Sequence, residues 1–393
     1  GEPTFISAEN RDAPEWKTAA LGKEKREKAV ELLYRLRNKF SKGGNLHFGQ
    51  GKWYGGETLP RWAFACIWRK DGEPIWNDTN NYAEEKTDYK YNYTHAKKFT
   101  ENLTQALCIP KISIKEAYED APYYLLRERF LPIEGKLIKA AEKDDEVKKL
   151  LNIDKSMLGK PKGFVLPLIY SIKRKKWISN TWKFRNKFMM LIPGDSPIGY
   201  RLPLNSIPYI KESEWEIPPE RSNFGEFENL PKRKIIDKKI ENNFKKKLTA
   251  KETEYLKKDK NGYVRTALCV EPRNGKLHIF LPPITYAEHY IELIAAIEFT
   301  AKKTGIKILI EGYEPPRDPR TNHFHITPDP GVIEVNVHPA KNWDDLKQIN
   351  EVLFEEAKQT MLTAEKFMID GRRVGTGGGN HITLGGITPT DSP

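Results

Sequence analysis

Residues 332–338 combine alternating apolar side chains with polar side chains that could bind a metal or a phosphate. In an extended strand alternate side chains leave opposite faces, so the apolar residues would share one face and Glu334, Asn336 and His338 the other. Neighbours on one face stand about 6.6 Å apart, which puts Glu334 about 13 Å from His338. Two adjacent side chains could hold one ion, whereas all three would serve a metal cluster or an extended polyphosphate. Oxygen ligands such as Glu and Asn favour Mg²⁺ or Mn²⁺ over zinc.

A glycine-rich turn at residues 375–379 could bind phosphate. Backbone amides without side chains approach phosphate oxygens closely, and Arg372 and Arg373 directly before the turn would neutralise their charge. A short strand after the turn would place His381 and Thr383 on one face. The turn is neither a Walker A loop nor a dinucleotide fingerprint, so a flexible connection is the alternative interpretation.

Two patterns lie just upstream of residue 332. Arg317 and Arg320 stand near prolines that fix the backbone, and the planar fork of arginine suits carboxylate or phosphate oxygens. A plain surface loop is the alternative. His323 and His325 have the spacing of two ligands on one strand face and, with His338, could form a zinc site. No cysteine or second carboxylate falls at metal spacing nearby, which disfavours zinc.

Polar residues that could contact a ligand also occur in an aromatic and glycine-rich block at 46–69 and in a predicted strand that begins at 263. In the first block a glycine loop would present side chains to a ligand, or the glycines would serve close packing beside Trp. These candidates are Gln50, Lys52, Glu57 and Arg61. On the strand, Arg265, Glu271 and Arg273 would lie on one face, where a cross-strand ion pair is the simplest account.

Helical periodicity predicts helices at residues 23–40, 95–108, 137–151 and 287–304, the last ended by Gly305. Apolar runs at 164–168 and 188–192 predict a strand pair with a charged connection, and residues 306–310 predict another strand. Residues 205–262 hold few apolar side chains and many Lys and Glu, which indicates a polar insertion or linker. The predicted parts are a helical and aromatic-rich segment with short strands (1–204), the insertion (205–262) and a sheet-containing core (263–393).

The composition is that of a globular chain: 393 residues, 38% hydrophobic and 31% charged, with a formal charge of +12. A lysine-rich solvated surface, densest at 232–260, is favoured over nucleic-acid binding. Cys66, Cys108 and Cys269 are widely spaced in apolar contexts, which argues against a disulfide framework and favours a cytoplasmic location. No run is long and apolar enough for a membrane span, and the start lacks both signal-peptide features and a Met, so we expect a segment of a longer protein.

Two motifs together resemble a known family. Residues 328–336, Pro-Asp-Pro-Gly-Val-Ile-Glu-Val-Asn, and 375–381, Gly-Thr-Gly-Gly-Gly-Asn-His, are similar to those of a bacterial family described as "putative amidoligases". That family is related to the glutamine-synthetase and glutamate-cysteine ligase superfamily. The likeness covers nearly the whole chain and includes residues 47–54 and 191–197.

The resemblance implies an α+β fold, in which a mostly antiparallel catalytic sheet, a glutamine-synthetase-like half-barrel packed by helices, carries ATP and divalent metal on its concave face. It also implies a transglutaminase-like domain elsewhere in the full-length chain. Glu334 matches the superfamily's metal-binding glutamate, Glu271 the acid on the first catalytic strand, and His381 the histidine after the glycine-asparagine turn. Arg273 stands where that strand often has a second acid, and Thr383 where a second histidine could follow, so the number of metals is left open.

The predicted site residues fall into three groups. The predicted metal ligands are Glu271, Glu334, Asn336, His338 and His381. The predicted nucleotide-binding residues are Lys52, Arg273, Gly377, Gly378, Gly379 and Asn380. The predicted catalytic arginines are Arg317, Arg320, Arg372 and Arg373.

The function expected from the resemblance is an ATP- and Mg²⁺-dependent (or Mn²⁺-dependent) ligase. It would join a carboxylate of a peptide or amino-acid derivative to an amine through an acyl-phosphate. Two alternatives stay open at this point. One is a non-catalytic basic module that engages an acidic partner through residues 232–260. The other is a metal-dependent hydrolase that uses His323, His325 and His338.

Overall fold

The computed structural model describes residues 2–57, 60–119, 158–184, 187–207, 227–246, 264–368 and 370–376, together with 211, 213, 215, 217–219, 221, 381, 382, 384 and 385. Contacts divide the chain into two compact units. Unit 1 comprises Gly1–Asn77, Arg221–Arg233 and Arg317–Pro393, and unit 2 comprises Asp78–Glu220 and Lys234–Pro316. Residues after 263 contribute strands to both units, and the predicted linear division into three parts stays a prediction.

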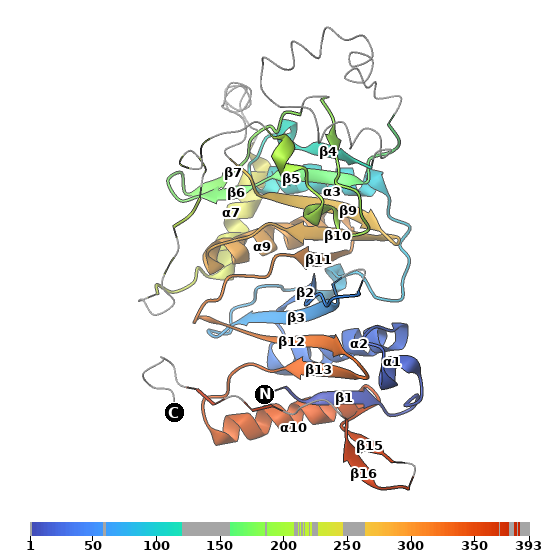
Figure 1. Ribbon diagram of the computed structural model, residues 1–393. Helices are drawn as coiled ribbons and strands as arrows, with labels where there is room; N and C mark the ends of the chain where they lie inside the picture. Colours follow the sequence, from blue (N-terminus) through green and yellow to red (C-terminus); the bar gives the residue numbers. More distant parts are fainter. Residues whose placement is uncertain are drawn as a thin grey trace. The chain divides into compact units, whose positions relative to one another are not determined.

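Unit 1 is built on a sheet with the strand order β14-β1-β13-β12-β3-β2, in which every pairing is antiparallel (Figure 1). In that order the strands are Leu362–Thr363, Thr4–Ser7, Val332–Asn336, Thr321–Asp329, Trp62–Arg69 and Asn45–Gln50. A separate hairpin pairs β15 (Glu365–Phe367) with β16 (Arg373–Gly375). The N-terminal strand thus pairs with a strand more than three hundred residues away, which no local pattern predicts.

Helices cover one face of this sheet. α2 (Lys23–Phe40) packs on β3 and β12, and α10 (Trp343–Gln359) packs on α2. Their apolar stripes meet the alternate strand residues that point the same way, as the Phe40–Phe324 and Phe354–Phe5 ring pairs illustrate at 5.8 and 5.3 Å. A short helix α1 (Pro14–Lys17) precedes α2. The opposite face of the central strands keeps its half-buried polar side chains.

Unit 2 contains a second sheet, with the strand order β11-β10-β9-β5-β4-β8 (Figure 1). In that order the strands are Ile308–Gly312, Lys276–Leu281, Ala267–Arg273, Gly163–Pro167, Lys115–Tyr118 and Met189–Met190. The β10–β11 and β4–β8 pairs are parallel and the others antiparallel. A hairpin of β6 (Ile169–Ser171) and β7 (Lys176–Ile178) stands beside it.

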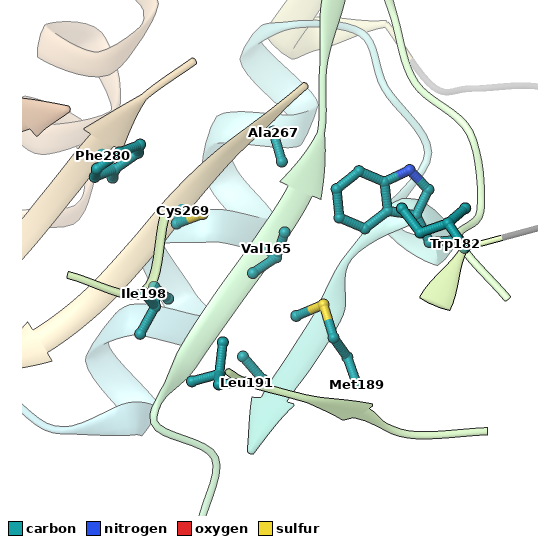
Figure 2. Packing of buried hydrophobic residues seen from close by; sticks show 10 residues of the cluster. Val165, Trp182, Met189, Leu191, Ile198, Ala267, Cys269 and Phe280 are labelled. Atoms are coloured by element: carbon teal, nitrogen blue, oxygen red, sulfur yellow. The ribbon is translucent and has the colours of Figure 1, made fainter. Parts of the chain in front are cut away.

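Both faces of the second sheet are covered. α3 (Tyr93–Ala106) packs on β5 and β9 and against α9 (Ala287–Thr304). A further helix, α7, spans Arg233–Lys245. On the other face lies the apolar cluster of Figure 2, where Val165, Met189, Cys269 and Phe280 of the sheet meet Trp182 and Ile198. Each fully buried large side chain of this kind contributes about 1.5–3 kcal/mol. Trp182 also donates its Nε1–H to the Val264 carbonyl at 2.8 Å.

The helices predicted at 23–40, 95–108 and 287–304 are confirmed, and Gly305 ends the last with φ +69° in the left-handed conformation. The helix predicted at 137–151 lies outside the described residues. The predicted pairing of 164–168 with 188–192 is wrong, because β5 pairs with β4 and β9 and β8 pairs with β4. The charged connection is instead the turn of the β6–β7 hairpin.

The α+β class with mostly antiparallel sheets is confirmed. Whether either sheet forms a glutamine-synthetase-like half-barrel stays a prediction. Within the described parts of the chain, no helix combines the length and the apolar character needed to cross a membrane.

Candidate functional site

The polar face of the unit 1 sheet presents a cross-strand row centred on Glu334. Thr327 of β12 stands opposite Glu334 of β13, and Glu334 stands opposite Thr4 of β1. One step along, His325 stands opposite Asn336. Glu334 and Asn336 therefore share a face, as the alternation predicts, while Val335 between them is buried.

One flank of the glycine turn contacts β1, and the other contacts Glu2 just before β1. The hydroxyl oxygens of Thr376 and Thr4 are 2.5 Å apart, and both residues are buried. Farther along, Glu2 donates its backbone N–H to the His381 carbonyl at 2.9 Å, and its carboxylate lies 3.4 Å from His381 Nδ1. Gly377, Gly378, Gly379 and Asn380, between these anchors, lie outside the described residues, as does Thr383. The structure thus brings the ends of the turn to the strand that pairs with Glu334.

The surroundings of Glu334 disfavour the negative charge of its carboxylate. Burial raises the pKa of the Glu334 carboxyl, and the nearby carboxylates of Asp329 and Glu2 raise it further. Lys52 and His381 act in the opposite direction without reversing the result. A group with too many negative neighbours is stabilised by a cation or by partial protonation, so this face suits a positively charged ligand.

Arg61 binds two carboxylates at one end of the polar face of the unit 1 sheet. Its guanidinium contacts Asp329 Oδ1 at 2.6 Å and Glu57 Oε1 at 2.9 Å, and it stacks over the Tyr54 ring at 4.1 Å. On the backbone, Arg61 donates its N–H to the Lys52 carbonyl at 3.0 Å. Through these contacts the buried Arg61 fixes the position of the loop that carries Lys52. Lys52 itself is exposed, and Gln50 is half-buried at the end of β2.

The four predicted catalytic arginines do not gather around Glu334 in their described contacts. Arg320 binds Asp318 at 2.6 Å, Arg372 binds Asp370 at 2.6 Å and Arg373 binds Glu365 at 3.3 Å. The side chains of Arg372 and Arg373 are 78% and 72% exposed, so these surface pairs contribute little stability. Arg317 is exposed. Their catalytic roles stay predictions.

His338 does not lie on the same face as Glu334 and Asn336, contrary to the prediction for residues 332–338. β13 ends at Asn336, so the alternation does not extend to His338. Its ring packs 5.0 Å from that of Phe40 and 4.9 Å from that of Trp68, on the side where α2 covers the sheet. Burial lowers its pKa to about 4, which keeps the imidazole neutral. Pro339 follows directly, and a proline cannot donate a ladder hydrogen bond, which explains the early end of the strand.

The zinc hypothesis is not supported. The rings of His323 and His325 lie 5.0 Å apart, while the ring of His338 is packed among aromatic side chains. Across the described part of the chain, no group of three or more His, Cys, Asp or Glu side chains could hold a metal ion. A metal-dependent hydrolase built on these histidines therefore lacks its site.

Magnesium fits the polar face better than zinc does. Mg²⁺ keeps several waters and takes one or two protein carboxylates together with substrate phosphates, whereas zinc requires three or four protein ligands. Glu334 and Glu2 offer such carboxylates, and the charge crowding that raises the pKa of Glu334 is what a bound cation would relieve.

Glu271 and Arg273 belong to a different cluster, in unit 2. Arg273 contacts Glu271 at 2.8 Å and Glu311 at 2.6 Å, and His278 Nδ1 lies 3.2 Å from the Glu311 carboxylate. Glu271 also accepts the Ile198 backbone N–H at 3.1 Å. The contact between Glu271 and Arg273 agrees with their predicted common face. That pair lies within one strand, and the cross-strand ion pair, which the sequence analysis expected, is the one between Arg273 of β9 and Glu311 of β11.

The pKa values of the two carboxyl groups in this cluster are shifted in opposite directions. Burial raises the pKa of Glu271 in spite of Arg273. Burial would also raise the pKa of Glu311, but His278 and Arg273 outweigh it and hold the value at about 2. The charge of Arg273 is thus committed to two buried glutamates, and its predicted role in binding nucleotide stays untested.

Several residues of both clusters were not predicted. Thr327 and Asp329 alternate with buried apolar residues along β12, a signal present in the sequence. His278 and Glu311 are instead single polar residues within the otherwise apolar, buried runs of β10 and β11. Thr4, Glu2 and Thr376 carry no such signal, because only the pairing of distant segments brings them to Glu334.

Comparison with family models matches residues 1–393 to the family described as "Putative amidoligase enzyme". No curated protein and no solved structure matches the chain. The family description names an amide-forming ligase, which is the coarse activity that the motifs at 328–336 and 375–381 indicated. Because the match extends over the full length given, the chain belongs to this family.

Proposed function

We propose that this chain is an ATP-dependent ligase that joins a carboxylate to an amine, and that its nucleotide phosphates bind on the polar face of the unit 1 sheet. The observation that carries the proposal is the position of Glu334, between Thr327 and Thr4 and beside both anchored ends of the glycine turn. Membership of a family described as amide-forming supports the reaction class.

In the proposed reaction a substrate carboxylate oxygen attacks the γ-phosphorus of ATP, and ADP leaves. The amine nitrogen then attacks the acyl carbon of the acyl-phosphate, inorganic phosphate leaves, and the amine loses a proton. A bound Mg²⁺, held by Glu334 and Glu2, would neutralise phosphate charge during the first step. Both steps need positioned charges more than covalent help from the protein.

The residues of this chain would act by position and charge. Lys52 supplies a positive charge near Glu334, and we assign its ammonium group and a ring N–H of His381 to phosphate oxygens. The buried Thr4–Thr376 contact would hold the start of the glycine turn close to those oxygens. Arg61 would fix the loop that carries Lys52 through its pairs with Glu57 and Asp329.

The decisive experiment is calorimetry with a non-hydrolysable ATP analogue, with and without Mg²⁺. We expect wild-type binding to require Mg²⁺ and the Glu334→Gln variant to bind roughly tenfold or more weakly, because a charge-assisted ligand is lost. Glu351→Gln is the matched control, since Glu351 is 66% exposed on α10 and pairs only with Lys347 at 3.8 Å among the described residues.

Two results would contradict the proposal in different ways. If Glu334→Gln binds the analogue as tightly as wild type, the site is misplaced. If the wild-type chain binds no nucleotide in excess Mg²⁺, this chain is not an ATP-dependent ligase on its own. Trapping of the acyl-phosphate as a hydroxamate, with hydroxylamine as the amine, then tests the reaction with candidate amino-acid and peptide carboxylates.

A further inference from the structure

A cavity of 490 Å³ lies within unit 2, and none of its lining residues belongs to the charge clusters described above. Its walls come from the β6–β7 hairpin, the approach to β9, the segment after β10 and the start of α9. Most of the lining is apolar or aromatic, and includes Leu168, Tyr170, Trp177, Trp215, Pro282 and Ile284. The size and the apolar character are those of cavities that hold small organic ligands.

Aromatic rings make one wall of this cavity stiff. The rings of Tyr170 and His289 are stacked with centroids 3.6 Å apart, and Trp177 meets Tyr170 edge to face at 5.4 Å. Trp177 is 5% exposed, and its Nε1–H is buried without an acceptor among the described residues. A buried donor with no partner is costly, which favours a ligand that supplies an acceptor.

One cationic side chain of the lining, that of Arg265, has no anionic partner among the residues that the structure describes. The Arg265 guanidinium donates to the Leu204 carbonyl at 2.7 Å and lies over the Trp215 ring at 5.2 Å. No carboxylate of the described residues contacts the Arg265 guanidinium, and burial lowers its pKa. Since arginine carries five N–H donors in a planar fork, most of its hydrogen-bonding capacity is left for a ligand.

We propose that this cavity binds a small monocarboxylate with an apolar or aromatic body, whose carboxylate pairs with Arg265 and whose body packs against Tyr170 and Trp177. One cation in an apolar cavity matches one negative charge, whereas a phosphate dianion would bring a second, uncompensated charge out of water. This proposal does not rest on the ligase function, because the binding requires neither nucleotide nor metal.

The experiment uses the full chain and follows quenching of tryptophan fluorescence, with calorimetry as the second measurement. The probes are 3-phenylpropionate, octanoate and the neutral analogue 3-phenylpropionamide, and phenyl phosphate tests the dianion. We expect at least one of the two acids to bind saturably, and 3-phenylpropionate to bind roughly tenfold or more tightly than its amide, as for a hydrogen-bonded charge pair.

Variants assign the binding to the cavity. Arg265→Gln should abolish the preference for acid over amide, and Arg265→Lys should keep part of it because the charge stays. Tyr170→Ala should weaken acid and amide alike. Arg174→Gln, on the exposed turn of the same hairpin, should change neither, and circular dichroism should show the same fold in every variant.

Four outcomes would overturn the proposal. They are equal binding of acid and amide by wild type, an unchanged preference in a folded Arg265→Gln variant, tighter binding of phenyl phosphate than of 3-phenylpropionate, and the lack of saturable binding by either acid. Loss of acid binding in Arg174→Gln would equally place the ligand elsewhere.

Discussion

Arg273 holds two buried carboxylates in unit 2, so the Arg273→Met variant tests whether this cluster stabilises the fold. The guanidinium lies 2.8 Å from Glu271 and 2.6 Å from Glu311, and those two residues are only 8% and 5% exposed. Methionine fills a comparable volume without a charge. The variant would therefore leave two buried glutamates with His278 as their remaining partner in the cluster.

The expected cost can be worked out in two ways. Removing one partner of a buried ion pair costs about 3–5 kcal/mol. The Glu311 carboxyl gives a second measure, because its pKa is about 2 instead of the ordinary 4.5, a difference worth about 3 kcal/mol. His278 accounts for the larger share of that lowering and Arg273 for the rest, but Arg273 also binds Glu271, so we expect the free energy of unfolding to fall by about 3 kcal/mol.

The pH dependence has a definite sign. In wild type the folded pKa of Glu311 lies below its unfolded value, so its stabilisation is present above about pH 4.5 and is lost as the pH falls toward 2. Without Arg273 the folded pKa values of both glutamates rise, and the ionised form of Glu271, already disfavoured by burial, destabilises the fold further at neutral pH. The difference in stability between wild type and variant should therefore shrink on acidification.

Urea unfolding followed by circular dichroism measures this difference at neutral pH and at about pH 4. Arg372→Met is the matched control, because it deletes an arginine that pairs with Asp370 at 2.6 Å but is 78% exposed, and it should cost less than about 1 kcal/mol. Adding Glu271→Gln and Glu311→Gln to Arg273→Met should restore stability. If Arg273→Met costs no more than the control at neutral pH, the reasoning about this cluster is wrong.

Three further predictions concern single sites. Gly331→Ala should lower the free energy of unfolding by about 2–4 kcal/mol, because its φ is +73° and a Cβ would lie 2.7 Å from a backbone oxygen of α1; thermal unfolding checks this, and an unchanged midpoint would contradict it. In the native protein only Cys108 should react quickly with a thiol reagent, because it is partly exposed while the other two cysteines are buried, Cys66 and Cys269; rapid labelling of all three would refute the packing. Burial lowers the pKa of Lys25 to about 8 from 10.5, so the unfolded chain binds more protons than the folded chain between these two pH values. As the pH rises through this range, the free energy of unfolding of wild type should therefore increase by about 3 kcal/mol relative to that of Lys25→Met. Urea unfolding below and above the range measures this increase, which would be missing if Lys25 were solvated.

The sequence predicts those parts of the fold that depend on local periodicity. The helix at 287–304 combines an apolar stripe with a glycine that adopts φ +69° immediately after it, so both its face and its end can be inferred. The common face of Glu271 and Arg273 follows from the same kind of reasoning at a period of two. In these segments tertiary packing reinforces the local preference.

Long-range pairing accounts for what the sequence does not predict. Glu311 completes the Arg273 cluster only because β11 lies parallel to β10, with Glu311 opposite Phe280 and beside the row that contains His278. Thr4 reaches Glu334 through a pairing across more than three hundred residues. No periodicity within either segment encodes the identity of its neighbour.

The register of β13 is what places Glu334 on the polar face. Ile333 and Val335 are fully buried against the helix side, and a slip of one residue would bury Glu334 there and expose both of them. Losing two buried aliphatic side chains alone would cost about 3–6 kcal/mol, before the cost of burying a carboxylate is counted. The apolar half of the strand thus fixes the position of its charged half, which holds a carboxylate in surroundings that raise its pKa.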